Sequence, residues 1–289
     1  MNDAVTIPPS PPNGSPPNGS SPNASSPNVS SPHMLAEVDG AIGWMIFNKP
    51  ERRNAVSLDM WAAIPDILRA FDADPAVRVI VLKGAGDKAF VSGADISQFE
   101  KTRASADANV EYERVFESAC EALSLCAKPS IAMIRGYCIG GGMAIALGCD
   151  LRIASENAIF GIPAARLGVG YGAAGVKKLM DVVGPAFTKE IFYTARHFSA
   201  ADARVMGLVN RVVADSDLES FTASYCATIA GNAPLTMAAL KRTVIELSRD
   251  TPADLAVCER LVAGCFASAD FIEGRRAFME KRRPVFRGV

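Results

Sequence analysis

Apolar residues in this chain follow two patterns, short continuous runs and longer stretches with helical spacing. The runs at 42–47 (IGWMIF) and 77–82 (VRVIVL) place apolar residues on both faces of a short strand, which is typical of strands buried in a parallel sheet. Between these runs, apolar residues recur at helical spacing behind Ser57, a candidate N-cap, and they are Trp61, Ile64, Ile67, Leu68 and Phe71. Pro65 falls inside this stretch and predicts a kink or a late helix start.

The same alternation continues in the middle of the chain. Residues 130–134 and 151–154 predict two further buried strands, and a helix is expected to begin among the glycines at 140–142. Strand, helix and strand therefore repeat along the chain, which places the fold in the α/β class.

Helical spacing dominates after about residue 185. Ser199, followed three residues later by Asp202, resembles a capping-box start, and Gly207 is a suitable helix stop. A short strand at 209–213 is the expected exception. The later helical segments carry apolar stripes that a helical bundle or a neighbouring subunit would have to cover.

The first 33 residues differ in composition, because Ser, Pro, Asn and Gly dominate them. Such a segment buries too little apolar surface to offset its chain entropy, so it is predicted to be disordered. It has no Lys or Arg and no apolar run, unlike a signal peptide or a mitochondrial transit peptide. The sequence therefore predicts a tail at 1–33, an α/β core at 34–198 and a mainly helical oligomerisation region at 199–289.

Charge and cysteine usage argue against several classes of function. Lys and Arg number 30 against 31 Asp and Glu, and the net charge of -1 does not favour a nucleic acid or an anionic membrane as partner. The seven cysteines never form a C-x-x-C pair, so neither a metal site nor a redox centre is expected. They are typical of a reducing compartment such as the cytoplasm. No apolar run reaches the roughly 18 residues that a membrane-spanning helix needs.

Two segments are candidates for chemistry. Residues 90–96 (FVSGADI) follow the strand at 77–82, and by themselves they are typical of a simple turn. Residues 136–144 (GYCIGGGMA) run through three glycines into a helix, whose first N–H groups point outward and suit a developing negative oxygen. Tight packing of that helix against a sheet explains the same glycines equally well.

Taken together and in this order, the two segments resemble the enoyl-CoA hydratase/isomerase (crotonase) superfamily. The resemblance extends from about residue 35 to residue 286. It includes residues 48–55 (NKPERRNA), 149–151 (CDL), 160–163 (FGIP), 203–209 (ARVMGLV) and 278–282 (FMEKR). It implies a crotonase-like spiral of ββα units with a C-terminal α-helical trimerisation region, assembled as a homotrimer or hexamer.

The resemblance also implies a substrate and a mechanism. The substrate is an acyl-CoA thioester, and no separate cofactor is expected. In this superfamily the backbone N–H groups at the positions of Ala94 and Gly141 form the oxyanion hole for the thioester carbonyl. Two such preorganised donors stabilise an enolate, which agrees with the interpretation of the glycine-rich helix start.

Further positions match the CoA-binding stretches of the superfamily. The loop at 48–55 and the turn at 94–96 match segments that hold the adenine and the pantetheine, and Lys281 with Arg282 matches cations that meet the CoA phosphates. The implied binding residues are Lys49, Arg53, Ala55, Ala94, Asp95, Ile96, Gly141 and Lys281. For the two C-terminal cations, solvated surface charge is the ordinary alternative.

The chain departs from the hydratase pattern at both catalytic glutamates. Hydratases carry one glutamate two residues after the glycine triplet and another directly after the F-G-x-P proline, where this chain has Ala144 and Ala164. Alanine can neither transfer a proton nor orient a water molecule, so the two-glutamate hydration mechanism is not available. A non-catalytic acyl-CoA-binding family member is therefore an alternative to an enzyme.

A second local resemblance concerns Tyr171. Residues 167–171 (LGVGY) and 189–195 resemble bacterial methylmalonyl-CoA decarboxylase, in which a tyrosine at this place reaches the acyl group. A malonyl-type acyl-CoA decarboxylase is thus a further alternative, because decarboxylation forms an enolate without a base. The match is incomplete, since Ala94 stands where that enzyme has a histidine. A packed loop aromatic is an equally good interpretation of Tyr171.

Three other features lead away from catalysis. His197 has no nucleophile in a recognisable motif, so a Ser-His-Asp hydrolase is not expected. Arg166 is a candidate partner for a substrate carboxylate, but a solvated or intersubunit ion pair is the commoner role. Residues 170–175 spell G-x-G-x-x-G, but Arg196 and His197 stand where a dinucleotide-binding fold needs an acidic residue.

Overall fold

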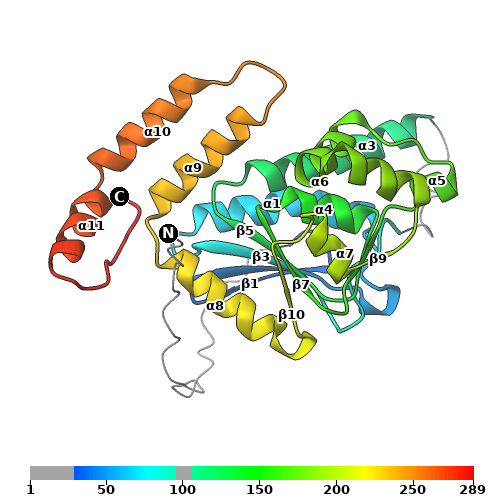
Figure 1. The fold of residues 1–289 in the computed structure, drawn as a ribbon, viewed down its shortest axis with the longest axis horizontal. Helices are drawn as coiled ribbons and strands as arrows, with labels where there is room; N and C mark the ends of the chain where they lie inside the picture. The colour runs from blue at the N-terminus through cyan, green and yellow to red at the C-terminus, as the bar shows by residue number, and fades with distance from the viewer. Residues whose placement is uncertain (1–28, 96–105) are drawn as a thin grey trace, which may run out of the picture.

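The computed structural model describes residues 29–95 and 106–289. Its centre is a six-stranded sheet in the order β1-β2-β3-β5-β7-β10 (Figure 1). The strands are β1 (Met34–Asp39), β2 (Ile42–Phe47), β3 (Val79–Gly84), β5 (Ser130–Ile134), β7 (Leu151–Ser155) and β10 (Arg211–Val213). Neighbouring strands run parallel except β1 and β2, which form an antiparallel pair.

A second sheet, with the strand order β4-β6-β8-β9, is built from very short strands. They are β4 (Ala89–Val91), β6 (Tyr137–Ile139), β8 (Ile159–Gly161) and β9 (Phe198–Ser199). Strands β4, β6 and β8 come directly after β3, β5 and β7 in the chain, and a helix follows each pair. The chain therefore repeats a ββα unit, and the spiral of ββα units predicted from the resemblance is confirmed.

Helices cover both faces of the first sheet, which explains its continuous apolar runs. Val79 and Val81 pack toward α8 (Leu218–Ala230), whereas Ile80 and Leu82 belong to the larger core under α1. The helices on that side are α1 (Leu58–Ala73), α3 (Ala106–Leu125), α4 (Gly141–Gly148) and α6 (Ala173–Thr194), and Figure 1 shows them opposite α8. Two shorter helices, α5 (Ala164–Leu167) and α7 (Ala200–Val205), complete the core.

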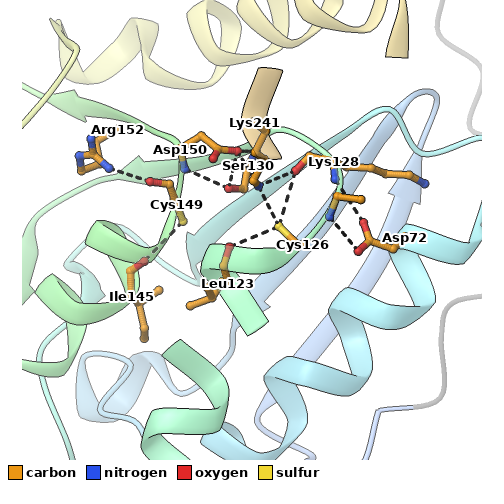
Figure 2. Close-up of polar contacts among 11 residues, drawn as sticks. Asp72, Leu123, Cys126, Lys128, Ser130, Ile145, Cys149, Asp150, Arg152 and Lys241 are labelled. Carbon is orange, nitrogen blue, oxygen red and sulfur yellow. Dashed lines mark hydrogen bonds and ion pairs between the residues drawn. The ribbon is translucent and has the colours of Figure 1, made fainter. Parts of the chain in front are cut away.

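Three C-terminal helices form an arm that projects from this core (Figure 1). They are α9 (Pro234–Leu247), α10 (Leu255–Ala267) and α11 (Ala269–Met279). Lys241 on α9 anchors the arm, because its Nζ lies 2.8 Å from Asp150 Oδ2 and 3.0 Å from the Lys128 carbonyl oxygen (Figure 2). Asp150 also accepts a hydrogen bond from the Ser130 N–H at 2.7 Å. The anchor thus joins α9 to the start of β5 and to the residue before β7.

Several predicted element boundaries agree with the structure. Strands β2 and β5 have the predicted bounds 42–47 and 130–134, and β3 lies two residues beyond the predicted 77–82. Helix α7 begins with a complete capping box, in which Ser199 and Asp202 each accept the other's backbone N–H. The helical C-terminal region is confirmed as well.

Pro65 predicts a kink or a late helix start, and the late-start alternative is wrong. The helix begins at Leu58 and runs through Pro65. Pro65 has no N–H to donate to the carbonyl of Trp61 one turn earlier, so the helix tolerates one missing hydrogen bond there. The apolar face of α1 is buried against the core, and this burial outweighs the local cost.

The described chain begins inside the segment predicted as a tail. Ser31 is 2% exposed, and its Oγ donates to Asp59 Oδ2 at 2.5 Å. The Asn48 N–H donates to the His33 carbonyl at 2.8 Å. Ordered contacts therefore begin a few residues before the predicted boundary, while residues 1–28 lie outside the described part of the chain.

Candidate active site

The glycine-rich helix start and the turn after β4 come together in the structure. Helix α4 begins at Gly141 straight after β6, because Gly140 takes a left-handed φ of 52° that favours glycine. A methyl group placed on Gly141 would lie 3.5 Å from the backbone nitrogen of Ala94. The two residues whose N–H groups are predicted to form an oxyanion hole are therefore neighbours.

Backbone pairing turns the Ala94 N–H away from Val56. Val56 donates its N–H to Gly93 and accepts from the Asp95 N–H, both at 2.9 Å. Because successive N–H groups of an extended segment point to opposite sides, the Ala94 N–H faces the other way. Among the described residues, neither this N–H nor that of Gly141 donates to an acceptor. Two free donors at the N-terminus of α4 are suited to bind a ligand oxygen that carries negative charge.

Asn54 shapes the loop that precedes α1. Its side chain is fully buried, and its Nδ2 donates to the carbonyl oxygens of Ala85 at 3.0 Å and Ala89 at 2.8 Å. Its Oδ1 accepts from the Lys49 N–H at 2.9 Å. The backbone of Asn54 is left-handed, with φ of 55°, which asparagine tolerates better than most residues. The sequence assigned this loop to CoA binding but did not identify Asn54 as the residue that holds it.

The structure joins the two predicted CoA-binding stretches through an ion pair. Lys49 Nζ lies 2.7 Å from Asp95 Oδ2, and the side chains are only 12% and 8% exposed. The Arg53 guanidinium lies over the ring of Tyr137, 5.0 Å from its centroid. Ile96, predicted to bind substrate, lies outside the described residues. Lys49 and Asp95 therefore fix the geometry of the site by binding each other.

Trp61 is a neighbour of Gly141 that the sequence did not identify as functional. The ring is fully buried, and its Cζ2 atom would lie 3.1 Å from a methyl group on Gly141. Phe116 of α3 meets the indole edge-on, with ring centroids 5.0 Å apart. Sequence reasoning assigned Trp61 to the apolar stripe of a helix, and helical spacing alone does not distinguish a core residue from one that borders a site.

The positions of the two missing glutamates lie at the starts of two helices. Ala144 is half-buried in the first turn of α4, and Ala164, 8% exposed, is the first residue of α5. Neither methyl group can carry a proton. Proton transfer beside the two N–H donors would therefore have to come from another side chain or from the substrate itself.

Tyr171 is packed in the loop before α6. Its ring meets Phe192 edge-on, with centroids 4.9 Å apart. Burial raises the pKa of Tyr171 to about 12, and the nearby Cys120 and Glu113 of α3 add to the rise. The phenol is therefore neutral at physiological pH and can donate a hydrogen bond. Its Oη makes no hydrogen bond to another described residue, so both alternatives for Tyr171, a packed aromatic and a substrate contact, fit its surroundings.

The remaining predicted binding residues lie on different parts of the molecule. Ala55 ends the loop before α1, where its N–H donates to the Arg52 carbonyl at 3.1 Å. Lys281 follows α11 with a left-handed φ of 53°, and Figure 1 shows α11 at the opposite end of the molecule from α5. Arg282 is held by Glu273, with 2.6 Å between Nη1 and Oε1. Within the described chain Lys281 makes no ion pair, so its ammonium group is available to a ligand or another copy.

Other kinds of site find little support in the described part of the chain. No group of three His, Cys, Asp or Glu residues there could hold a metal ion. The G-x-G-x-x-G stretch at 170–175 follows the short helix α5 and not a strand, which excludes a dinucleotide fingerprint. No helix among these residues has the length and apolar character needed to cross a membrane.

Comparison with known proteins decides the family. The sequence model for enoyl-CoA hydratase/isomerase matches residues 37–289. The chain belongs to the enoyl-CoA hydratase/isomerase family. This membership makes it an acyl-CoA enzyme by family, and the match covers both the spiral core and the helical arm.

Individual relatives include hydratases and isomerases. The chain is 33% identical to the short-chain-enoyl-CoA hydratase of Clostridium acetobutylicum, over 87% of this chain and 96% of that protein. It is 32% identical to the peroxisomal Delta(3,5)-Delta(2,4)-dienoyl-CoA isomerase of Arabidopsis thaliana, over 86% of this chain and 93% of that protein. Relatives with different reactions are thus equally similar, and overall identity does not select between them.

Solved structures of the family share the whole fold. An enoyl-CoA hydratase/carnithine racemase from Magnetospirillum magneticum superposes with a TM-score of 0.85 at 34% identity, covering 90% of this chain and 97% of that one. An enoyl-CoA hydratase from Bacillus anthracis gives a TM-score of 0.83 at 29% identity, covering 89% of this chain and all of that one (100%). The spiral core and the C-terminal helices are therefore features of the family architecture.

Proposed function

We propose that this family member binds an acyl-CoA thioester with its carbonyl oxygen between the N–H groups of Ala94 and Gly141 and stabilises the enolate that forms there. The observation that carries this proposal is the approach of Ala94 N to Gly141, with both N–H groups left without an acceptor in the described chain. A preorganised donor of this kind contributes about 2.7–4 kcal/mol to a transition state.

Ala144 and Ala164 limit which reactions of the family this chain can catalyse. Hydration needs a base for the water and an acid for the carbon, and Ala144 and Ala164 supply neither. We therefore assign a reaction in which the enolate forms without those glutamates, as an isomerase-type or lyase-type member of the family. Glu113 is the first carboxylate to examine as a replacement base, because it lies close enough to influence the pKa of Tyr171.

Decarboxylation of a malonyl-type acyl-CoA is the second candidate. In that reaction the bond between Cα and the carboxylate breaks, carbon dioxide leaves, and the electron pair enters the enolate, which later takes a proton at Cα. No base is needed for the first step. Tyr171 supports this candidate, because a pKa of about 12 keeps its hydroxyl protonated as a donor to the acyl group.

We further propose that the arm is covered by other copies of the chain in a homotrimer or hexamer. Eight large apolar side chains on the three helices of the arm are between 55% and 82% exposed, and they are Leu240, Val244, Leu247, Leu255, Phe266, Ile272, Phe278 and Met279. The arm also holds an apolar groove of about 1030 Å³. Such surfaces are uncommon on monomers. Light scattering should report a trimer or hexamer, and a monomer at micromolar concentration would contradict this part of the proposal.

CoA binding is assigned to the loop and turn joined by Lys49 and Asp95, together with Arg53, Ala55 and Ile96. Because Lys281 follows α11 on the arm, we propose that it meets the CoA phosphates in the assembled oligomer. The thioester is the substrate and no separate cofactor is required. The seven cysteines are unpaired, which supports a reducing compartment, and we assign the cytoplasm.

A substrate panel tests the proposed function. The purified chain is incubated with crotonyl-CoA, a 3-enoyl-CoA, malonyl-CoA and methylmalonyl-CoA, products are separated by liquid chromatography and identified by mass spectrometry, and thermal unfolding is followed with each ligand. Turnover of any thioester with loss in Gly141→Pro supports the enzyme proposal. Stabilisation of the fold by thioesters without any turnover would identify the alternative, a non-catalytic acyl-CoA binder.

A further inference from the structure

Among the residues that the structure describes, the indole N–H of Trp61 has no hydrogen-bond partner. The side chain is 0% exposed, and Nε1 meets no acceptor in the described structure. A buried donor left unsatisfied costs about 1–3 kcal/mol, and most such groups in native proteins find an acceptor. The N–H of Trp61 is therefore a buried donor for which the described residues supply no acceptor.

The edge of the indole that carries this N–H lies beside Gly141. The ring atom nearest to a methyl group on Gly141 is Cζ2, at 3.1 Å, and the nitrogen of Ala94 is next, at 3.5 Å. Cζ2 is bonded to the ring carbon that also carries Nε1, so the two atoms share one edge of the indole. Nε1 is thus two bonds away from a ring atom that lies close to Gly141.

The surroundings of the ring fix this orientation. Phe116 packs edge-on against the indole from α3. Pro65 lies one turn further along α1 and cannot donate a hydrogen bond to the Trp61 carbonyl. The helix nevertheless continues through Pro65, so the backbone at Trp61 is helical. A phenylalanine or a leucine could fill the same space in the core. Only an acceptor in the site makes use of the N–H.

We propose that the Trp61 Nε1–H is a third hydrogen-bond donor of the oxyanion site and donates to an oxygen of the bound acyl group. This proposal rests on the proposed function and adds a catalytic residue to it. The acceptor is either the thioester oxygen itself or a second oxygen close to it, as in a 3-oxoacyl or malonyl-type thioester. A neutral N–H can donate to either of these oxygens. Neither Ala144 nor Ala164 offers a carboxylate that would compete with the ligand for this N–H.

Nuclear magnetic resonance of the indole N–H groups tests the proposal directly. The chain has two tryptophans, so 15N-labelled protein shows two indole signals, which Trp44→Phe assigns. Trp44 lies in β2, under the ammonium group of Lys83, and serves as the internal reference. The probes are CoA, butyryl-CoA, acetoacetyl-CoA and malonyl-CoA, each at a concentration where calorimetry shows binding.

We expect the Trp61 N–H proton signal to move downfield with thioesters and to stay in place with CoA, while the Trp44 signal stays in place throughout. Movement with butyryl-CoA identifies the thioester oxygen as the acceptor. Movement only with acetoacetyl-CoA or malonyl-CoA identifies a second oxygen. If Trp61 does not respond to any thioester that calorimetry shows to be bound, the proposal is overturned.

Kinetics of Trp61→Phe supply a second test, since this change keeps an aromatic ring and removes the N–H. We expect kcat to fall roughly 2- to 10-fold, the value of one neutral hydrogen bond, with KM nearly unchanged. A variant that keeps the wild-type kcat, while Gly141→Pro is inactive, would reject the role of Trp61 and leave the proposed function standing. If Gly141→Pro is also fully active, the proposed function itself fails.

Discussion

Gly141 offers a sharp test, because two substitutions there separate the N–H group from the space beside it. Both alanine and proline add a Cβ, which would lie 3.1 Å from Trp61 Cζ2 and 3.5 Å from Ala94 N. Only proline also removes the N–H. Gly141 is the first residue of α4, a position where proline is well tolerated in helices, so Gly141→Pro is expected to fold.

The expected loss of activity follows from the energy of one oxyanion-hole donor. Removing such a donor costs about 10²- to 10³-fold in kcat, or about 2.7–4 kcal/mol. We therefore expect Gly141→Pro to be slower than Gly141→Ala by about this factor, measured on the best thioester of the panel. Gly141→Ala should lose less than Gly141→Pro, because its Cβ crowds Trp61 without removing the donor.

Circular dichroism and thermal unfolding of both variants separate misfolding from lost chemistry. Gly264→Ala is the matched control, because this glycine lies within α10 and a Cβ there meets no atom within 4 Å. It should keep full activity and be slightly more stable, since alanine favours a helix interior by about 1 kcal/mol. Equal activity of Gly141→Pro and Gly141→Ala would refute the reasoning.

Three further predictions concern the other parts of the account. Crotonyl-CoA hydration should be slow or undetectable in the wild type. The double variant Ala144→Glu with Ala164→Glu should raise the hydration rate, because each acid–base group contributes about 10²- to 10⁴-fold. No gain in a folded double variant would contradict this prediction. Lys241→Met should lower the free energy of unfolding by about 1.5–3 kcal/mol, because it removes the hydrogen-bonded ion pair with Asp150. An unchanged melting temperature would show that this ion pair does not stabilise the fold. Because the pKa of Tyr171 is raised to about 12 from 10.0, its stabilising contribution is complete below about pH 10 and is lost as pH rises toward 12. The difference in stability between wild type and Tyr171→Phe should therefore change only in that window, and a change near neutral pH would contradict the assignment.

Hydrophobic patterning predicted the first sheet better than the second. Strands β2 and β5 were predictable because five or six consecutive apolar or small residues are covered on both faces. Strands β4, β6 and β8 have only three residues each, too few for any periodic signal, and they overlap the motifs that carry chemistry. The ββα repeat was accessible only through the resemblance to the superfamily.

In the candidate site, features carried by one sequence motif were predictable, whereas contacts between residues distant in the sequence were not. The glycine triplet and the turn at Ala94 were predictable as oxyanion-hole segments, because each has its own motif. The pairing of Lys49 with Asp95 joins residues 46 positions apart and leaves no local sequence signal. The placement of the Trp61 edge beside Gly141 likewise depends on how α1 packs against α4, which helical spacing does not specify.

The most direct test of the central claim is the ionisation of acetoacetyl-CoA on the protein, followed by the ultraviolet absorbance of its enolate as a function of pH. If the N–H groups of Ala94 and Gly141 stabilise an enolate oxygen, the bound ligand should ionise at a lower pH than the free ligand, and Gly141→Pro should reverse most of the shift. Ionisation of the bound ligand at the same pH as in free solution, in a wild-type protein that binds it, would contradict the account.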